Sequence, residues 1–278
     1  MTDALVPGLY IIATPIGNLG DVTVRALDVL KRVSIIYAED KRVTSRLLGH
    51  YGISTACAVY HEHNAARMRP RILARLEQEA VALVADAGTP LVNDPGYKLV
   101  REALARGHRV TSLPGPSAVM AALTLAGLPT DRFLFAGFAP AKAAARRRFY
   151  ADLLAAGTTT LVFEAPHRLA ASLGDLAALA PERPLAICRE LTKAFEEVLR
   201  GTVEAVRQRV AAHPLKGEIV LVIGPGASAG GRQVDCNEAL REALQTMRLR
   251  EAVAHVAATT GLPRREVYAR ALALKERS

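Results

Sequence analysis

The chain has 278 residues, half of them hydrophobic and 23% charged, with no Trp and a formal net charge of +9. This length exceeds one ordinary domain of roughly 100–200 residues, and the apolar content excludes a disordered chain, so we expect at least two folded domains. Neither an apolar run of about 18 residues nor a signal-peptide-like start occurs, so we expect a cytoplasmic protein rather than a membrane or secreted one.

The positive charge favours a polyanionic partner such as RNA, because Lys and Arg neutralise phosphates and release counterions. A basic surface that serves only solubility is the alternative. The three cysteines, Cys57, Cys188 and Cys236, are far apart and show no CxxC spacing. A disulfide framework and a thiolate zinc site are therefore not expected.

Within residues 1–113, short apolar runs alternate with segments of helical periodicity. We expect strands at residues 8–14, 34–38, 56–60, 80–85 and 109–113, with helices at residues 23–33, 44–50, 68–78 and 96–106. Strands separated by helices require crossover connections. The pattern therefore predicts an α/β domain with a mostly parallel, helix-covered sheet.

The turn residues 114–116 (PGP) precede a second stretch of the same kind. We expect helices at residues 117–126, 146–155 and 168–179, and strands at residues 133–137, 159–163, 185–189 and 218–223. Residues 114–226 are thus predicted to form a second α/β domain, again with a mostly parallel sheet.

Residues 227–278 are expected to hold a linker and a small helical unit. Residues 224–231 (GPGASAGG) have the composition of a linker. Residues 251–258 and 263–274 flank a glycine turn and have the outline of a helix-turn-helix, with Pro263 as the first residue of the second helix. A plain helical hairpin and a nucleic-acid-binding unit both fit this pattern.

Glycine-containing loops follow predicted strands at residues 15–19, 86–90 and 114–117. Loops at the carboxyl ends of parallel strands form ligand crevices, although glycines there can also be simple turn formers. Dinucleotide and P-loop fingerprints are absent. Asp86 either pairs with a ligand or caps its turn. His61 and His63 lack the further ligands that zinc requires, so no metal site is predicted.

A basic cluster of Lys142, Arg146, Arg147 and Arg148 follows the predicted strand at residues 133–137. Such side chains can hold phosphates by charge and by bidentate hydrogen bonds. The alternative is an exposed helix face with no binding role.

Nine segments, in order, closely resemble the ribosomal RNA small subunit methyltransferase I family, of the tetrapyrrole methylase fold group. They are GLYIIATPIGNLGDVTVRAL, YAEDKRVTSRLL, YHEHN, VADAGTPLVNDPGY, LPGPSAVMAAL, FAGFAP, FEAPHR, CRELTKAFEE and GEIVLVIG. The resemblance covers roughly residues 8–226. It extends to the helical unit, where fewer motif residues match. It implies 2′-O-methylation of a cytidine ribose in small-subunit (16S) ribosomal RNA, with S-adenosyl-L-methionine as donor and the small (30S) subunit as partner.

The resemblance also implies a homodimer and a donor site in a cleft between the two domains. The donor positions that it implies are Pro15, Gly17, Asp86, Ala87, Gly88, Val92, Ser117, Ala118, Phe163 and Glu164.

Methyl transfer to a ribose hydroxyl requires alignment of oxygen, carbon and sulfur, and removal of one proton. Candidate bases are Glu39, Asp40, His61 and Glu164, and their order stays open. Candidate RNA-binding cations are Arg42, Lys142, Arg146, Arg147 and Arg148.

Two other functions are compatible with the same residues. One is a tetrapyrrole or protein methyltransferase of the same fold group, and the other is a non-catalytic RNA-binding ribosome assembly factor. Affinity for S-adenosylmethionine would favour an enzyme, whereas RNA binding that ignores the donor would favour the assembly factor.

Overall fold

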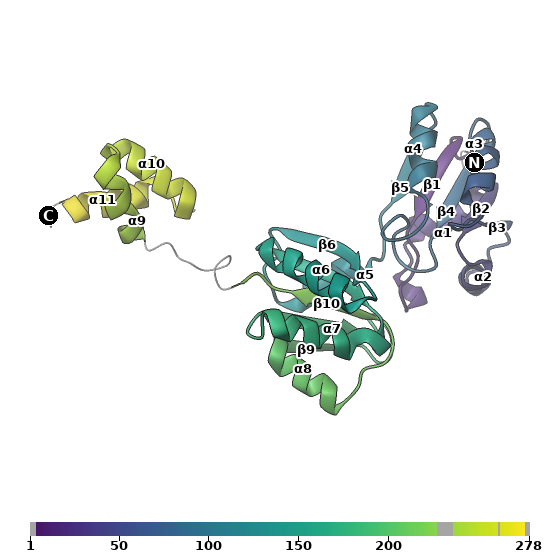
Figure 1. The fold of residues 1–278 in the computed structure, drawn as a ribbon. Coiled ribbons are helices and arrows are strands. Elements are labelled where there is room, and N and C mark those ends of the chain that lie inside the picture. The colour runs from purple at the N-terminus through teal and green to yellow at the C-terminus, as the bar shows by residue number, and fades with distance from the viewer. Residues whose placement is uncertain (1–3, 227–235, 261, 276–278) are drawn as a thin grey trace.

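The computed structural model describes residues 4–226, 236–260 and 262–275. Across these ranges two five-stranded sheets are followed by a group of helices (Figure 1). The predicted α/β class is confirmed. Among the described residues, no helix has both the length and the apolar character to cross a bilayer.

The first sheet is entirely parallel, as predicted, with strand order β3-β2-β4-β1-β5. Its strands are β1 (Gly8–Ile12), β2 (Ile35–Ala38), β3 (Cys57–Val59), β4 (Ala80–Val84) and β5 (Val110–Leu113). The connections contain η1 (Leu19–Asp21), α1 (Val24–Arg32), α2 (Lys41–His50), α3 (Ala65–Arg75) and α4 (Tyr97–Ala105). Since all strands run in the same direction, their carboxyl ends lie at the same end of the sheet.

Helices cover both faces of the first sheet. On β1, Tyr10 and Ile12 pack in a core that includes Leu30 of α1. Leu9 and Ile11 point the opposite way, into a core built with α3 and α4. Both β1 and β4 are buried along their whole length, which explains their uninterrupted apolar sequences.

The second sheet has strand order β6-β7-β10-β8-β9. Its strands are β6 (Phe133–Phe138), β7 (Thr159–Glu164), β8 (Pro184–Arg189), β9 (Glu197–Thr202) and β10 (Ile219–Ile223). Its helices are α5 (Ala118–Ala126), α6 (Ala143–Ala155), α7 (Pro166–Leu179) and α8 (Val203–Ala212). The helix α5 packs in one core of this sheet, and α6, α7 and α8 pack in the other (Figure 1).

Pairing in the second sheet is mixed, in contrast to the mostly parallel sheet that we expected. Only β6 and β7 pair in parallel, whereas β10 is antiparallel to β7 and β8, and β9 is antiparallel to β8. The cause is the connection of residues 190–196, which contains no helix and reverses the chain. Neither β9 nor α8 was predicted, and β9 escaped prediction because it is a half-buried edge strand with charged residues.

The C-terminal unit contains α9 (Cys236–Thr246), α10 (Leu249–Thr260) and α11 (Arg264–Lys275) around a small apolar core. The helix α9 was not predicted, and α11 begins one residue after Pro263. Residues 227–231 of the predicted linker lie outside the described residues. Because each sheet uses strands from only one side of residue 113, we keep domain boundaries after residues 113 and 226 as a proposal.

Candidate active site

One cavity, termed the main cavity, lies between loops of the first sheet and residues at the ends of strands and helices of the second. Its volume is about 460 Å³, within the ~300–1,000 Å³ typical of small-molecule sites. The first wall consists of Ile16, Glu39, residues 86–89 and residues 92–94. The second wall consists of residues 117–119, Phe138, residues 163–166 and residues 217–219.

The backbone fixes the first wall by joining the loops after β1 and β4. The N–H groups of Thr14 and Gly88 each donate to the other's carbonyl at 2.9 Å, and the Thr14 hydroxyl donates to the Ala85 carbonyl at 3.0 Å. Gly88 has φ +77°, a conformation that glycine adopts without strain. Ile16 then packs in the apolar core of the second sheet, so the joined loops are held against it.

Three carboxylates of the first wall lie close enough to influence one another. Asp86 accepts a hydrogen bond from the Asp40 N–H at 2.8 Å. Burial raises the pKa of Glu39, the charge of Asp86 adds to this, and His61 opposes it. Burial, then the charges of Glu39 and Asp86, raises the pKa of Asp94 to about 6. Asp94 therefore titrates near neutral pH.

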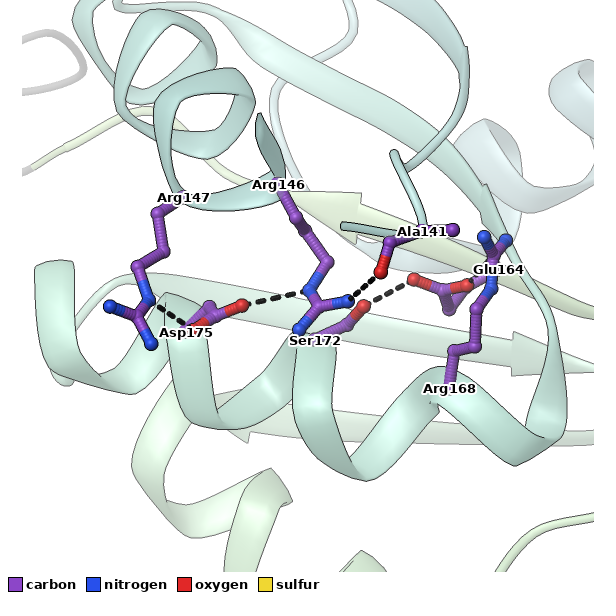
Figure 2. Close-up of polar contacts among 7 residues, drawn as sticks. All are labelled: Ala141, Arg146, Arg147, Glu164, Arg168, Ser172 and Asp175. Carbon is purple, nitrogen blue, oxygen red and sulfur yellow. Dashed lines mark hydrogen bonds and ion pairs between the residues drawn. The ribbon is translucent and has the colours of Figure 1, made fainter. Parts of the chain in front are cut away.

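Glu164, on the second wall, is enclosed by hydrogen-bond donors (Figure 2). Its Oε1 accepts from the Ala165 N–H at 2.8 Å and forms an ion pair with Arg168 Nη2 at 2.9 Å. Its Oε2 accepts from the Ser172 hydroxyl. Its side chain is 0% exposed, so the ion pair with Arg168 compensates a carboxylate removed from water.

Behind Glu164, two arginines of α6 converge on Asp175 of α7 (Figure 2). Arg146 Nε and Arg147 Nε each donate to one oxygen of Asp175 at 2.8 Å. Arg146 Nη1 also donates to the Ala141 carbonyl at 3.1 Å. Burial would raise the pKa of Asp175, but the hydrogen bonds from Arg147 and Arg146 lower it.

The connection of residues 190–196 packs against the loop that follows β1. Lys193 Nζ contacts Glu190 Oε1 at 2.8 Å and Glu218 Oε2 at 3.2 Å. A Cβ at Gly17 would collide with the Lys193 side chain. Gly17 is therefore required for close approach of the two loops.

Five carboxylates line the main cavity, and its described lining contains no Lys, Arg or His. Glu164 and Glu218 are ion-paired with Arg168 and Lys193, which do not line the cavity. The remaining three have no such cation partner there. Since opposite charges attract strongly where water is partly excluded, the cavity favours a positively charged ligand.

A family model for tetrapyrrole (corrin/porphyrin) methylases matches residues 8–207, and one for an RsmI C-terminal HTH domain matches residues 231–275. A protein of Mesorhizobium japonicum named ribosomal RNA small subunit methyltransferase I is 47% identical over 277 residues, 99% of this chain and 94% of its own. The chain belongs to this methyltransferase family. An Erythrobacter litoralis protein of the same name is 48% identical over 273 residues, 98% of this chain and 97% of its own.

Solved structures support the family's fold. A cobalt precorrin-4 methyltransferase has a TM-score of 0.59 at 19% identity, covering 78% of this chain and 94% of its own. A conserved hypothetical protein from Aeropyrum pernix K1 has a TM-score of 0.60 at 20% identity, covering 98% of each chain. The tetrapyrrole-methylase-like fold expected from the sequence is confirmed.

Eight of the ten donor positions implied by the family motifs line the main cavity: Asp86, Ala87, Gly88, Val92, Ser117, Ala118, Phe163 and Glu164. The other two, Pro15 and Gly17, line a second cavity that shares Ile16, Asp86 and Ala87 with the first. The structure brings these distant segments together, and their donor-binding role stays a prediction.

The four candidate bases lie in different environments. Glu39 and Glu164 line the main cavity, whereas Asp40 and His61 do not. Asp40 is the N-cap of α2, and hydrogen bonds from Arg42 lower its pKa to about 2. The His61 Nδ1 accepts from the Asn64 N–H at 3.2 Å. This geometry favours Glu39, because both oxygens of Glu164 are already engaged.

The predicted basic cluster is not a uniform exposed face. Arg146 is only 6% exposed, and its guanidinium is held by Asp175, so the expectation of a phosphate contact is corrected for this residue. Its helix position faces α7, which supplies the aspartate that compensates its burial. Lys142, Arg147 and Arg148 are exposed. Arg42, also exposed, forms an ion pair with Asp40 at 2.7 Å.

Sequence reasoning missed Asp94 and Glu218 as cavity residues. Asp94 stands in the quoted segment VADAGTPLVNDPGY, close after the predicted strand that ends at Ala85, so its position in the same loop was an available signal. Glu218 begins a predicted strand, and only antiparallel insertion of β10 beside β7 brings that end to the cavity. No group of three or more potential metal ligands occurs among the residues described.

Proposed function

We propose that the chain transfers a methyl group from S-adenosyl-L-methionine to the 2′-hydroxyl of a cytidine ribose in small-subunit ribosomal RNA. The observation that carries the proposal is the main cavity, rich in carboxylates, in a chain that belongs to this methyltransferase family. The names of the Mesorhizobium japonicum and Erythrobacter litoralis relatives supply the substrate class.

The residues of the main cavity fit the donor chemically. S-adenosylmethionine carries a sulfonium and an ammonium against one carboxylate, so its net charge is positive. Glu39, Asp86 and Asp94 offer carboxylates that no cation of the cavity lining neutralises. Apolar groups of Val92 and Phe163 provide contacts for uncharged parts of the donor. We assign donor binding to these residues together with Gly88, Ser117 and Ala118.

When bound, the donor supplies an electrophilic methyl group on its sulfonium. The protein then has to hold the ribose hydroxyl in line with that methyl group and accept its proton. Glu39 and Asp94 suit the second task, because both face the cavity and a raised carboxyl pKa makes a stronger base. Glu164 is better suited to holding the second wall in place.

Recognition of RNA is supported by the net charge of +9 and by the C-terminal unit that matches a helix-turn-helix model. We further propose a homodimer that acts on the small ribosomal subunit in the cytoplasm. A monomeric mass in light scattering at micromolar concentration would contradict the dimer.

The deciding experiment is transfer of a radiolabelled methyl group from S-adenosylmethionine to purified small subunits that lack the native modification. The labelled site is then mapped by resistance to alkaline cleavage. Label at a single cytidine 2′-hydroxyl is expected. Tight donor binding without RNA labelling would favour a tetrapyrrole or protein acceptor. RNA binding without donor affinity would favour an assembly factor.

A further inference from the structure

The second cavity, termed the adjoining cavity, shares a wall with the main cavity. It has a volume of about 360 Å³ and is bounded by the loop after β1, by α2 and by Lys193. Ile16, Asp86 and Ala87 line both cavities. A molecule in the adjoining cavity would therefore lie directly beside the donor.

Two hydroxyls at the adjoining cavity are buried without partners. Thr44 lines the cavity, is only 4% exposed, and its Oγ1 has no hydrogen-bond partner among the described residues. The Oγ1 of Thr192 is likewise buried and unpaired, and a Cβ on Gly17 of the cavity wall would come within 2.9 Å of it. Buried polar groups in folded proteins nearly always have a partner, so these hydroxyls indicate a missing ligand.

The charges around the adjoining cavity differ from those of the main cavity. Arg46 lines it, is exposed, and forms no ion pair within the described part of the chain. Lys193 adds a second cation, although Glu190 and Glu218 partly neutralise it. Leu19 and Val43, both partly exposed, add apolar surface. A cation, free hydroxyls and apolar surface together suit a nucleotide unit.

We propose that the adjoining cavity binds a ribose-phosphate unit of the RNA strand beside the methylated nucleotide, with Arg46 on the phosphate and Thr44 hydrogen-bonded to the sugar. This inference rests on the proposed function, because it requires an RNA acceptor. It assigns the acceptor strand to the side of α2.

The test compares Arg46→Gln with Arg71→Gln. Arg71 lies on α3, is exposed and lines neither cavity, so its variant removes the same charge elsewhere. Binding of purified small-subunit ribosomal RNA is measured by filter retention over a salt series, and donor affinity by calorimetry. We expect Arg46→Gln to weaken RNA binding about three- to tenfold and to reduce the salt slope by about one, with unchanged donor affinity. Arg71→Gln should change neither affinity.

A second variant, Thr44→Val, removes the unpaired hydroxyl while keeping the side-chain shape. Since that hydroxyl has no partner among the residues that the structure describes, we expect the Tm to stay the same or rise. RNA binding should nevertheless weaken severalfold. A merely structural Thr44 would instead give a lower Tm with unchanged RNA binding.

Equal RNA affinities for the Arg46 and Arg71 variants would overturn the inference. Loss of donor affinity in Arg46→Gln, with RNA affinity kept, would also overturn it and assign the cavity to the donor. Methyl transfer by the protein without substitutions is measured in a separate assay. RNA binding that depends on Arg46 without methyl transfer would therefore refute the proposed function and leave the binding site supported.

Discussion

Carboxylates on the second wall of the main cavity are paired with cations, whereas those on the first wall are not. Glu164 is bonded to Arg168, and Glu218 contacts Lys193. On the first wall, Glu39 and Asp94 have raised pKa values because burial and neighbouring negative charges oppose their ionisation. Ion pairs therefore hold helices and strands of the second wall together, whereas the first-wall carboxylates have no cation partner in the cavity lining, as the proposed binding of a cationic donor requires.

The largest effect should come from breaking the charge pairs behind the second wall. Arg146→Ala leaves Asp175 buried with Arg147 as its remaining partner. We expect the free energy of unfolding to fall by about 3 kcal/mol, the lower end for a broken buried pair. Urea unfolding measures this change. Arg148→Ala, on the same helix but exposed, is the control, and an equal loss there would show that Arg146 has no special role.

A fall in pH should lower the free energy of unfolding that the ion pairs of Asp175 with Arg146 and Arg147 contribute. The folded-state pKa of Asp175 is lowered, so the stability that it contributes is present above its ordinary value of 3.8 and is lost as pH falls through the folded value. In Asp175→Asn this part of the acid dependence should disappear.

Glu164→Gln tests whether Glu164 holds the wall or acts as the base. The substitution leaves Arg168 without its carboxylate, so we expect a loss of about 1–3 kcal/mol in unfolding free energy. If Glu164 only holds the wall, the variant that remains folded should retain methyl transfer with a similar pH profile. Loss of kcat with unchanged stability would instead identify Glu164 as the base.

Asp94→Asn should remove a pH dependence that belongs to the first wall. The pKa of Asp94 is about 6, so its carboxylate is ionised above that pH and protonated below it. In the unchanged protein we expect donor affinity to rise about three- to tenfold between pH 5 and 7, because the charge attracts a cationic donor. Calorimetry should show a weaker and flatter profile for the variant.

Stability supplies an independent check on Asp94. A carboxyl whose folded-state pKa is raised disfavours the folded state above that pKa, and the cost disappears as pH falls below the ordinary value of 3.8. Asp94→Asn should therefore raise the Tm at pH 7–8. A lower Tm at that pH would show that the carboxylate forms a stabilising contact.

Asp86 could contact a ligand or support its loop. It lines the main cavity, and it also accepts a hydrogen bond from the Asp40 N–H. Asp86→Asn keeps an acceptor oxygen but removes the charge, whereas Asp86→Ala removes both. We expect both variants to lose donor affinity severalfold and RNA affinity less. If Asp86→Asn binds the donor normally and Asp86→Ala does not, the role of Asp86 is to position the loop.

Much of the first sheet was predictable. Between β1 and β5, the apolar runs and the helical spacing of apolar residues correspond directly to the residues that are buried. The second sheet was harder, since the apolar run of β10 says nothing about strand direction. Its antiparallel insertion depends on the non-helical connection of residues 190–196 and on the half-buried strand β9.

The candidate site shows the same division. Family motifs named eight residues that line the main cavity, but no motif states whether a charged side chain is paired. Arg146 and Arg148 are two residues apart in a basic run, yet of these two only Arg146 contacts Asp175, twenty-nine residues away. Pairing of this kind depends on helix packing and is not contained in local sequence.

The smallest expected effect concerns Arg148, the neighbouring arginine that stays exposed. If it contacts an RNA phosphate, Arg148→Gln should lower the slope of log affinity against log salt by about one while stability is unchanged. Filter binding of small-subunit ribosomal RNA over a salt series measures the slope. Arg106→Gln, an exposed change at the end of α4, is the matched control. An unaltered slope in Arg148→Gln would place the RNA away from α6, since a removed phosphate contact must release fewer counterions.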